Sequence, residues 1–269
     1  WETGTNGLDW RAVPLPEGAG RPLALAVGGT PVQFVLATRP PGLYRKAPGA
    51  AGWTALAAPP APAGVVAPWV RVLTPGSGIS PTWFAAVAGA GLWRSEDGGA
   101  SWTACPGLPA EVHAIRAAAG PPGTVVLATS DGCWISRDDG RTWEDRGAGL
   151  GPARHLSVVE VAPDDPNFLL AGAAPTTAGG AATGGGVRGG LRFALYESKD
   201  GGKTWTHVTR GFPVELESDP IVDIRFDPAA PEFAVVALAS GECWNTRTAG
   251  AWWEPLARQL RGVRALCAV

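Results

Sequence analysis

The stretch WRSEDGGASW, residues 93–102, recurs as WISRDDGRTW at 134–143 and as YESKDGGKTW at 196–205. Each copy starts with a tryptophan or a tyrosine and ends with a tryptophan nine positions later, and this spacing occurs six times in the chain. The six pairs are Trp1/Trp10, Tyr44/Trp53, Trp93/Trp102, Trp134/Trp143, Tyr196/Trp205 and Trp244/Trp253. Their second members lie 43, 49, 41, 62 and 48 residues apart. A repeat of this length indicates stacked supersecondary units, and a four-stranded propeller blade is a unit of this size.

Each repeat divides into four short apolar runs that are separated by turn residues. In one complete repeat the runs are VHAIRAA (112–118), GTVVLATS (123–130), GCWISRD (132–138) and RTWEDR (141–146). Short runs bounded by turn residues are typical of antiparallel strands. No segment shows a convincing helical periodicity. The sequence therefore predicts an all-β chain.

The three quoted stretches share the polar pattern Ser-x-Asp-x-Gly-x-Ser/Thr-Trp. Side chains of Asp, Ser and Thr can bond to the backbone of their own turn, and Gly supplies a positive φ. We therefore interpret the pattern as a structural hairpin, with an acid/base carboxylate or a Ca²⁺ ligand as the alternatives. The pattern resembles the Asp-box, or BNR repeat, of sialidase-like propellers. The residues that carry this resemblance are Ser95, Asp97, Gly99, Trp102, Ser136, Asp138, Gly140, Trp143, Ser198, Asp200, Gly202 and Trp205.

The resemblance implies a β-propeller, and the repeat count predicts six four-stranded antiparallel blades in one domain over residues 1–269. Five complete blades are expected, at 21–57, 69–106, 112–147, 156–209 and 221–257. Residues 1–13 and 263–269 are expected to form one composite blade, which closes the ring and hides sheet edges. Seven blades is the alternative if the ring includes chain outside this sequence.

Composition excludes several classes of function. Charged residues make up 17% of the chain, the formal net charge is −2, and no Lys/Arg run is present, so nucleic-acid binding is not expected. No apolar stretch reaches the roughly 18 residues of a membrane-spanning helix. Methionine is absent, even at position 1, which suggests a removed export signal and a periplasmic or other extracytoplasmic location. The four cysteines have no metal-ligand spacing, so no metal, cofactor or disulfide framework is predicted.

Titratable residues of the expected innermost strands are candidates for a binding site in the central channel. They are Arg71, His113, Arg116, Glu160, Asp223, Arg225 and Arg264. Because side chains alternate along a strand, not all of them can face the channel. An arginine-rich channel can bind an anion or a carboxylate-bearing chain end, and a self-paired network of charges is the alternative.

Two irregular segments extend the candidate partner surface. AAPTTAGGAATGGGVRGG (173–190) carries one charge, Arg188, and is either a flexible insertion or a segment that orders on a partner or covers the channel. APPAPAGVVAPW (58–69) is rich in proline and is expected at the rim. Trp69 and Trp83 lie outside the repeat series and are therefore candidates for an interface, with burial as the alternative for each.

A sialidase-like activity can be tested against the residues present. It would imply three arginines, a Tyr nucleophile with a Glu partner, an Asp acid/base and an Arg-Ile-Pro signature, and that signature is absent. The two tyrosines, Tyr44 and Tyr196, occupy repeat slots that hold tryptophan elsewhere. Glu160 with Asp223 is the one carboxylate pair that we can put forward for glycoside hydrolysis. We therefore predict no catalytic residue.

The size of the chain and its degenerate boxes are similar to those of photosystem II stability/assembly-factor propellers. This resemblance implies a non-catalytic, protein-binding scaffold, accessory subunit or assembly factor. Its partner is expected to be a protein, with docking on the extramembrane part of a membrane complex, for example a photosynthetic one. A glycan-binding or glycan-hydrolysing propeller is the alternative function.

Overall fold

The computed structural model describes residues 9, 12–29, 31–60, 64, 68–77, 81–118, 123–150, 154–174, 192–213, 216–217 and 219–256. These residues form five antiparallel sheets, each built around four strands in chain order. The predicted all-β fold of four-stranded antiparallel sheets is confirmed. Most of the predicted closing segments, 1–13 and 263–269, lie outside the described residues.

The strands have the following bounds. The first sheet holds β1 (Arg21–Gly28), β2 (Gln33–Arg39), β3 (Gly42–Lys46) and β4 (Thr54–Leu56). The second holds β5 (Val70–Pro75), β6 (Trp83–Val87), β7 (Gly91–Ser95) and β8 (Thr103–Ala104). The third holds β9 (Val112–Ala117), β10 (Val125–Thr129), β11 (Gly132–Ser136) and β12 (Glu144–Asp145), and the short 3-10 helix η1 (Ala148–Leu150) follows it. The fourth holds β13 (Leu156–Val161), β14 (Leu169–Ala173), β15 (Arg192–Ser198) and β16 (Thr206–His207), with β17 (Leu216–Glu217) paired to β15. The fifth holds β18 (Ile221–Asp227), β19 (Ala230–Leu238), β20 (Cys243–Thr246) and β21 (Glu254–Pro255).

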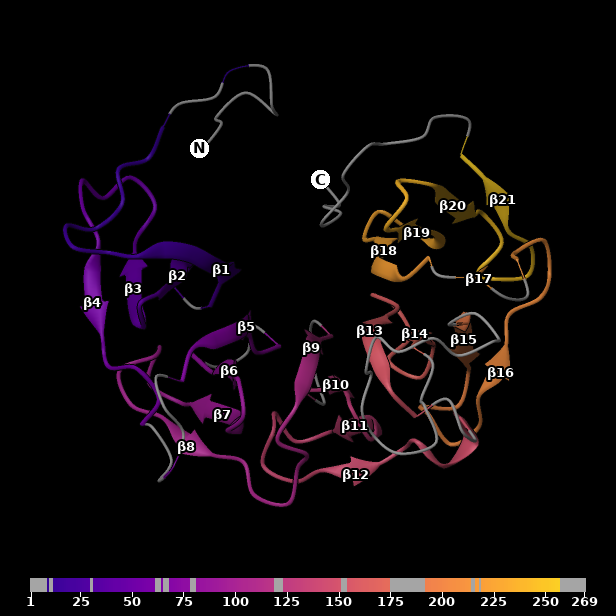
Figure 1. Cartoon of the computed structure of the whole chain (residues 1–269), viewed down its shortest axis with the longest axis horizontal. Helices are drawn as coiled ribbons and strands as arrows, with labels where there is room; N and C mark the ends of the chain where they lie inside the picture. Colours follow the sequence, from indigo (N-terminus) through magenta and orange to yellow (C-terminus); the bar gives the residue numbers. More distant parts are fainter. Residues whose placement is uncertain are drawn as a thin grey trace.

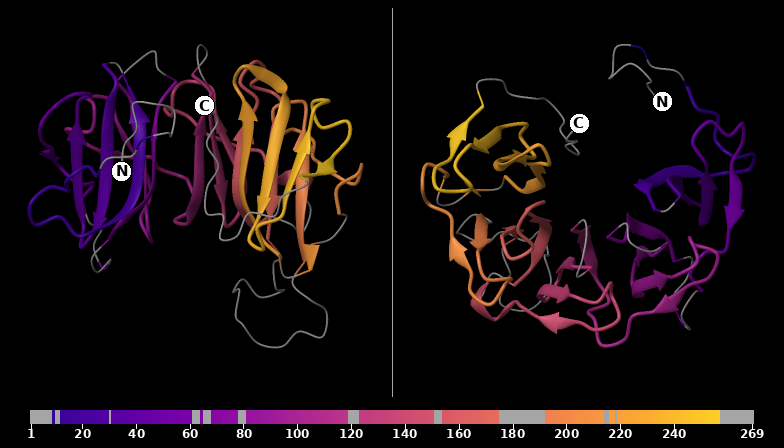
Figure 2. Two further views of the ribbon diagram at one scale, coloured as in Figure 1. Left: turned by 90° about the horizontal axis from the view of Figure 1, so that it is seen from above. Right: turned by 180° about the vertical axis from the view of Figure 1, so that it is seen from behind.

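The five sheets are arranged as blades around one centre (Figure 1). The first strand of each sheet, namely β1, β5, β9, β13 or β18, lies innermost, and the last strand lies at the rim. The innermost strands of successive blades are neighbours, and the view from above shows the blades standing side by side (Figure 2). This is the arrangement of a β-propeller.

The core lies between the blades. The second strands β6, β10 and β14 are buried at every position, and their sequences WFAAV, VVLAT and LLAGA contain almost no polar residue. A sheet that is covered on both faces needs such continuous apolar strands. The core between the first two blades contains Val35, Leu43, Leu73 and Trp83. Similar clusters lie between the following blades.

The innermost strands all run in the same direction. Arg71 on β5 pairs with Glu111 just before β9, and Thr74 farther along β5 bonds to Ile115 farther along β9. The same order holds between the third and fourth blades and between the fourth and fifth. The propeller therefore has two distinct faces, which we name the strand-start face and the strand-end face after the innermost strands.

Three polar turns join the third and fourth strands of their blades on the strand-end face. In the turn of β7, Asp97 Oδ1 accepts hydrogen bonds from Ser95 Oγ and from the backbone N of Ser101, each at 2.8 Å, while Ser101 Oγ donates to Asp97 Oδ2 at 2.6 Å. Ser95 Oγ also accepts from the backbone N of Gly99 at 2.8 Å. The turns at Asp138 and Asp200 repeat these bonds.

The turn of the fifth blade keeps part of this framework although it lacks the aspartate. The backbone N of Gly250 donates to Thr246 Oγ1 at 3.1 Å, and the backbone N of Trp252 donates to Thr248 Oγ1 at 3.0 Å. A threonine hydroxyl therefore substitutes for the aspartate as the acceptor at the centre of the turn.

Every innermost strand carries a β-bulge at the same level. The pairing with the second strand skips one residue in each blade: Leu23, Arg71, His113, Ser157 and Val222. A bulge re-aims the side chain of the extra residue. Two of the predicted channel residues, Arg71 and His113, occupy this special position. Within the described ranges, no helix is long and apolar enough to cross a membrane.

Candidate functional site

The strand-end mouth of the channel holds a compact network of four charged residues. Arg116 Nε donates to Glu160 Oε2 at 2.8 Å, and its Nη2 donates to Asp223 Oδ1 at 3.2 Å. Arg225 Nη1 lies 2.7 Å from the same Glu160 oxygen and 3.0 Å from the same Asp223 oxygen. These residues come from three successive blades, on β9, β13 and β18. The structure thus brings together four of the seven predicted channel residues.

This network is balanced in charge and largely buried. Glu160 and Asp223 are both buried, and each carboxylate lies between the same two guanidinium groups. Arg116 and Arg225 also donate to the backbone carbonyl oxygens of Ile115 and Ile224, which fixes both side chains against their own strands. Of the two interpretations that the sequence leaves open, the geometry corresponds to the self-paired one.

A broad cavity of about 690 Å³ lies over this network. Its wall includes Thr74, Arg116, Glu160, Arg225 and Phe226. The volume lies within the range of about 300–1,000 Å³ that is usual for ligand sites. Space alone does not distinguish a ligand site from an open channel mouth, and the charged groups of the wall already bind one another.

The strand-start mouth has a different character. Trp69 precedes β5, and the Cζ atoms of Arg39 and Arg71 each lie 5.7 Å from the centroid of its ring. Arg71 Nη1 donates to Glu111 Oε2 at 3.3 Å, and both side chains of this pair are more than a third exposed. An exposed ion pair of this kind stabilises little, so its groups can exchange one partner for another at small cost.

A histidine pair lies on the same face. The ring centroids of His113 and His155 are 4.7 Å apart, and His113 Nδ1 lies 2.7 Å from the carbonyl oxygen of Leu156, to which it donates. Burial lowers the pKa of His155, and the neighbouring charge of His113 lowers it further. The contact of the two rings links the starts of β9 and β13.

The bulge residues Arg71 and His113 lie three positions before the level of Arg116 on the innermost strands. At about 3.3 Å per residue, the two levels are about 10 Å apart along the channel. The seven predicted channel residues therefore do not form one site, because those that the structure describes divide between the two mouths.

Three further residues that the sequence predicted for partner binding are not among the described residues of either mouth. Trp83 is fully buried in the core between the first two blades, so its prediction as an interface residue is wrong for this fold. Both faces of β6 are covered by neighbouring blades, which leaves its aromatic side chains no route to the surface. Arg188 and Arg264 lie outside the described residues.

Hydrogen bonds within the polar turns lower the pKa of their aspartates. Burial alone would raise the pKa of Asp138, but hydrogen bonds from Thr142, Ser136 and Arg141 outweigh it and lower the pKa to about 2. The pKa of Asp97 falls to about 2 for the same reasons, and that of Asp200 falls to about 2 chiefly through the Thr204 hydroxyl. A carboxyl group that stays ionised down to this pH cannot donate a proton near neutral pH.

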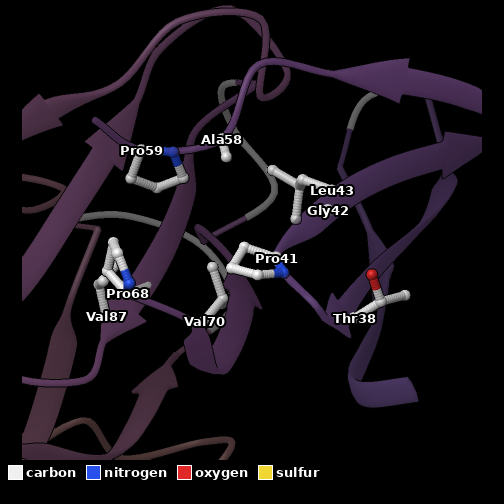
Figure 3. Close-up of a pocket in the computed structure, with 9 residues that line it drawn as sticks. All are labelled: Thr38, Pro41, Gly42, Leu43, Ala58, Pro59, Pro68, Val70 and Val87. Carbon is white, nitrogen blue, oxygen red and sulfur yellow. The ribbon is translucent and has the colours of Figure 1, made fainter. Parts of the chain in front are cut away.

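A second pocket lies between the first two blades, beside the proline-rich segment (Figure 3). Its walls include Pro41, Leu43, Pro59, Pro68 and Val70. The interior volume is only about 10 Å³, which is room for about one water molecule. This pocket is a packing defect rather than a ligand site. Among the described residues, no group of three or more His, Cys, Asp or Glu side chains is placed to hold a metal ion.

The sequence reasoning missed three residues of the strand-start mouth: Arg39, Glu111 and His155. The bulge residues His113 and Ser157 are equivalent, so His155 holds the same place before β13 that Glu111 holds before β9, two residues ahead of the bulge. Arg39 ends β2 and Glu111 lies just before β9, so neither belongs to an innermost strand, which is where channel residues were sought.

No protein-family model matches the chain, and no curated protein matches it. Among solved structures, YCF48 bound to a D1 peptide shares 16% identity with a TM-score of 0.57, over 93% of this chain and 73% of that one. The GH74 enzyme of Niastella koreensis shares 15% identity with a TM-score of 0.62, over 90% of this chain but only 40% of the enzyme. PorZ of the Porphyromonas gingivalis type-IX secretion system shares 11% identity with a TM-score of 0.59, over 93% of this chain and 29% of that one. At these identities the similarity shows a common propeller fold.

Proposed function

We propose that this protein is a non-catalytic binding propeller that docks on a protein partner through its strand-start face. It acts as a scaffold, accessory subunit or assembly factor of a larger complex. We further propose an extracytoplasmic location and a membrane-embedded complex, such as a photosynthetic one, as the setting. The three polar turns, whose sequences resemble Asp-boxes, serve in this proposal as structural hairpins.

The observation that carries this proposal is the contrast between the two channel mouths. At the strand-end mouth, Glu160 and Asp223 are held by Arg116 and Arg225. At the strand-start mouth, Trp69 stacks with two arginines, and the Arg71–Glu111 pair is more than a third exposed. Tryptophan and arginine are the residues that most often dominate the binding energy of protein interfaces. One structural neighbour, YCF48, is itself bound to a D1 peptide, which agrees with a binding role for this kind of propeller.

The experiment is a gentle purification of the tagged full chain from its native cells, with any bound protein identified by mass spectrometry. Arg71→Glu should release the partner. Arg141→Glu makes the same charge change at an exposed arginine of the strand-end face, and it should leave the partner bound. Loss of the partner in both variants, or in neither, would place the docking surface elsewhere.

The alternative is a glycan-hydrolysing propeller, which the buried Glu160 and Asp223 pair keeps open because hydrolysis of glycosides needs two carboxyl groups. A panel of fluorogenic glycosides tests it directly. The proposal expects no turnover above the buffer rate. Turnover that is abolished by Glu160→Gln or Asp223→Asn, in variants that remain folded, would replace the binding function with an enzymatic one.

A further inference from the structure

Five residues hold equivalent positions on the innermost strands, each in line with the repeat aromatic of its blade. They are Leu25, Leu73, Ile115, Val159 and Ile224, which pair across the sheet toward Tyr44, Trp93, Trp134, Tyr196 and Trp244. Leu73 is 6% exposed, and Ile115, Val159 and Ile224 are completely buried, because the preceding blade covers each of them. Leu25 is 60% exposed. Among the described residues, the first blade therefore has a face that no other sheet covers.

This face carries a groove of apolar side chains. The groove has a volume of about 230 Å³, and its walls include Val13, Leu15, Leu25, Phe34, Leu36 and Trp53. Leu15 in this wall and Val27, which follows Leu25 by two residues on β1, are also about half exposed. An exposed apolar patch of this kind marks a surface that contacts another segment or molecule.

One edge of the groove shows a hydrogen bond of the kind that joins the first two blades. Trp102 Nε1 donates to the carbonyl oxygen of Ala57 in the preceding blade at 3.0 Å, and Ala57 follows the repeat tryptophan Trp53 by four residues. Trp53 Nε1 donates in the same way to the carbonyl oxygen of Pro14 at 3.0 Å. Pro14 follows Trp10 by four residues. Pro14 thus occupies the place of the rim strand of a preceding blade.

The C-terminal segment fits the innermost strand of that blade. Three innermost strands, β5, β9 and β13, follow a pattern of an apolar residue, a bulge residue, a small or branched apolar residue, a larger or branched apolar residue and a channel residue. Examples are VRVLT (70–74) on β5 and VHAIR (112–116) on β9. VRALC (263–267) matches this pattern at every position. It resembles VRVLT of β5 more closely than the overlapping stretch LRGVR (260–264) does, because LRGVR has glycine and valine where β5 has valine and leucine.

We propose that residues 263–269 bind in the apolar groove of the first blade, beside β1, as the innermost strand of the blade to which Pro14 belongs. Arg264 takes the bulge position that Arg71 has on β5, and Leu266 takes the position of Leu73. Cys267 takes the position of Thr74, whose side chain contacts the carbonyl oxygen of Ile115 on the next blade. The residue equivalent to Ile115 in the first blade is Leu25, so Cys267 lies beside Leu25. This inference is independent of the proposed function.

The test is a cross-link within the full chain. Cysteine is placed at Leu25→Cys in a Cys105→Ala background, and the protein is treated with a short bis-maleimide at micromolar concentration. Arg141→Cys in the same background is the control, because Arg141 is equally exposed on the rim of a distant blade. Since the local concentration of a neighbouring group is in the millimolar range, the cross-link to Cys267 should form at least about tenfold faster in the Leu25→Cys protein.

Mass spectrometry of the cross-linked peptides decides the outcome. A bridge between residues 25 and 267 in monomeric protein supports the proposal. Equal rates in the two proteins would overturn it, and so would a bridge that appears only between two chains, because the groove would then bind a second copy. A bridge that also forms in a Leu266→Asp variant would overturn it as well, because the leucine is what holds the segment in the groove.

Discussion

The two faces of the propeller use the same kinds of residue in opposite ways. On the strand-end face, each charged group of the channel has its counter-charge beside it, and the three polar turns satisfy their own backbone groups. On the strand-start face, Arg71 and Glu111 form a pair open to solvent, and Trp69 contacts two arginines. The first face is built to hold blades together. The second can change its contacts at little cost, which is the property that a docking surface needs.

The largest expected difference between the faces is in stability. Arg116→Met removes one of the two cations that hold Glu160 and Asp223, and leaving buried charge poorly paired should cost about 3 kcal/mol of unfolding free energy. Arg71→Met breaks only an exposed pair and should cost less than about 1 kcal/mol. Urea denaturation of both variants measures the difference. An equal loss of unfolding free energy in both variants would contradict the difference between a buried network at one mouth and an exposed ion pair at the other.

The next effect is on partner binding. Trp69→Ala removes the aromatic ring that Arg39 and Arg71 contact, and it should weaken binding by about 2 kcal/mol, or about 30-fold, as is usual for a central interface residue. Trp252→Ala is the matched control, because Trp252 is 59% exposed at the turn of the fifth blade on the strand-end face. Binding is measured by titration against the purified partner. A larger loss for Trp252→Ala would move the docking surface to the strand-end face.

The strand-end face should lose stability in strong acid. The pKa of Asp97, Asp138 and Asp200 is about 2 in the folded protein and about 4 when the chain is unfolded. Because the folded-state pKa is the lower one, the stabilisation is complete above pH 4 and is lost as the pH falls toward 2. Between pH 5 and pH 2, the free energy of unfolding should therefore decrease less in an Asp138→Asn variant than in the wild type, as denaturation curves at each pH would measure. An equal decrease of the unfolding free energy in the two proteins would contradict the lowered pKa of Asp138.

The smallest effect is expected on the strand-start face, in a higher pH range. The pKa of His155 is lowered in the folded state, so the unfolded chain takes up protons first as the pH falls below about 6.5. Stability should therefore decrease slightly from pH 7.5 to pH 5.5. His155→Gln should remove this slope, while His207→Gln, on the rim strand β16, should keep it. NMR titration of the His155 ring provides a direct second measurement.

The sequence predicted the blades because the repeat determines the strand register. Arg116, Glu160 and Arg225 lie at the same level of three innermost strands, so the repeat alone places them near one another. It could not show that they neutralise one another, since that depends on side-chain rotamers across blades. The bulges at Arg71 and His113 were also beyond sequence reasoning, because one skipped residue in a ladder leaves the apolar pattern almost unchanged.

Trp83 shows how the same reasoning fails. Its absence from the repeat series made it a candidate for an interface, yet it belongs to β6, whose sequence WFAAV is apolar throughout. In a strand that is covered on both faces, such a run predicts burial at every position. Trp69 precedes its strand and follows prolines, so it escapes this rule and stays partly exposed.

The most direct test of the account is a hydrogen-exchange footprint of the purified chain with and without its bound partner. We predict slower exchange of backbone amides at the starts of β5, β9 and β13, around Trp69, Arg71 and His113, with the polar turns at Asp97, Asp138 and Asp200 unchanged. Protection that is confined to the polar turns and the ends of these strands would contradict it.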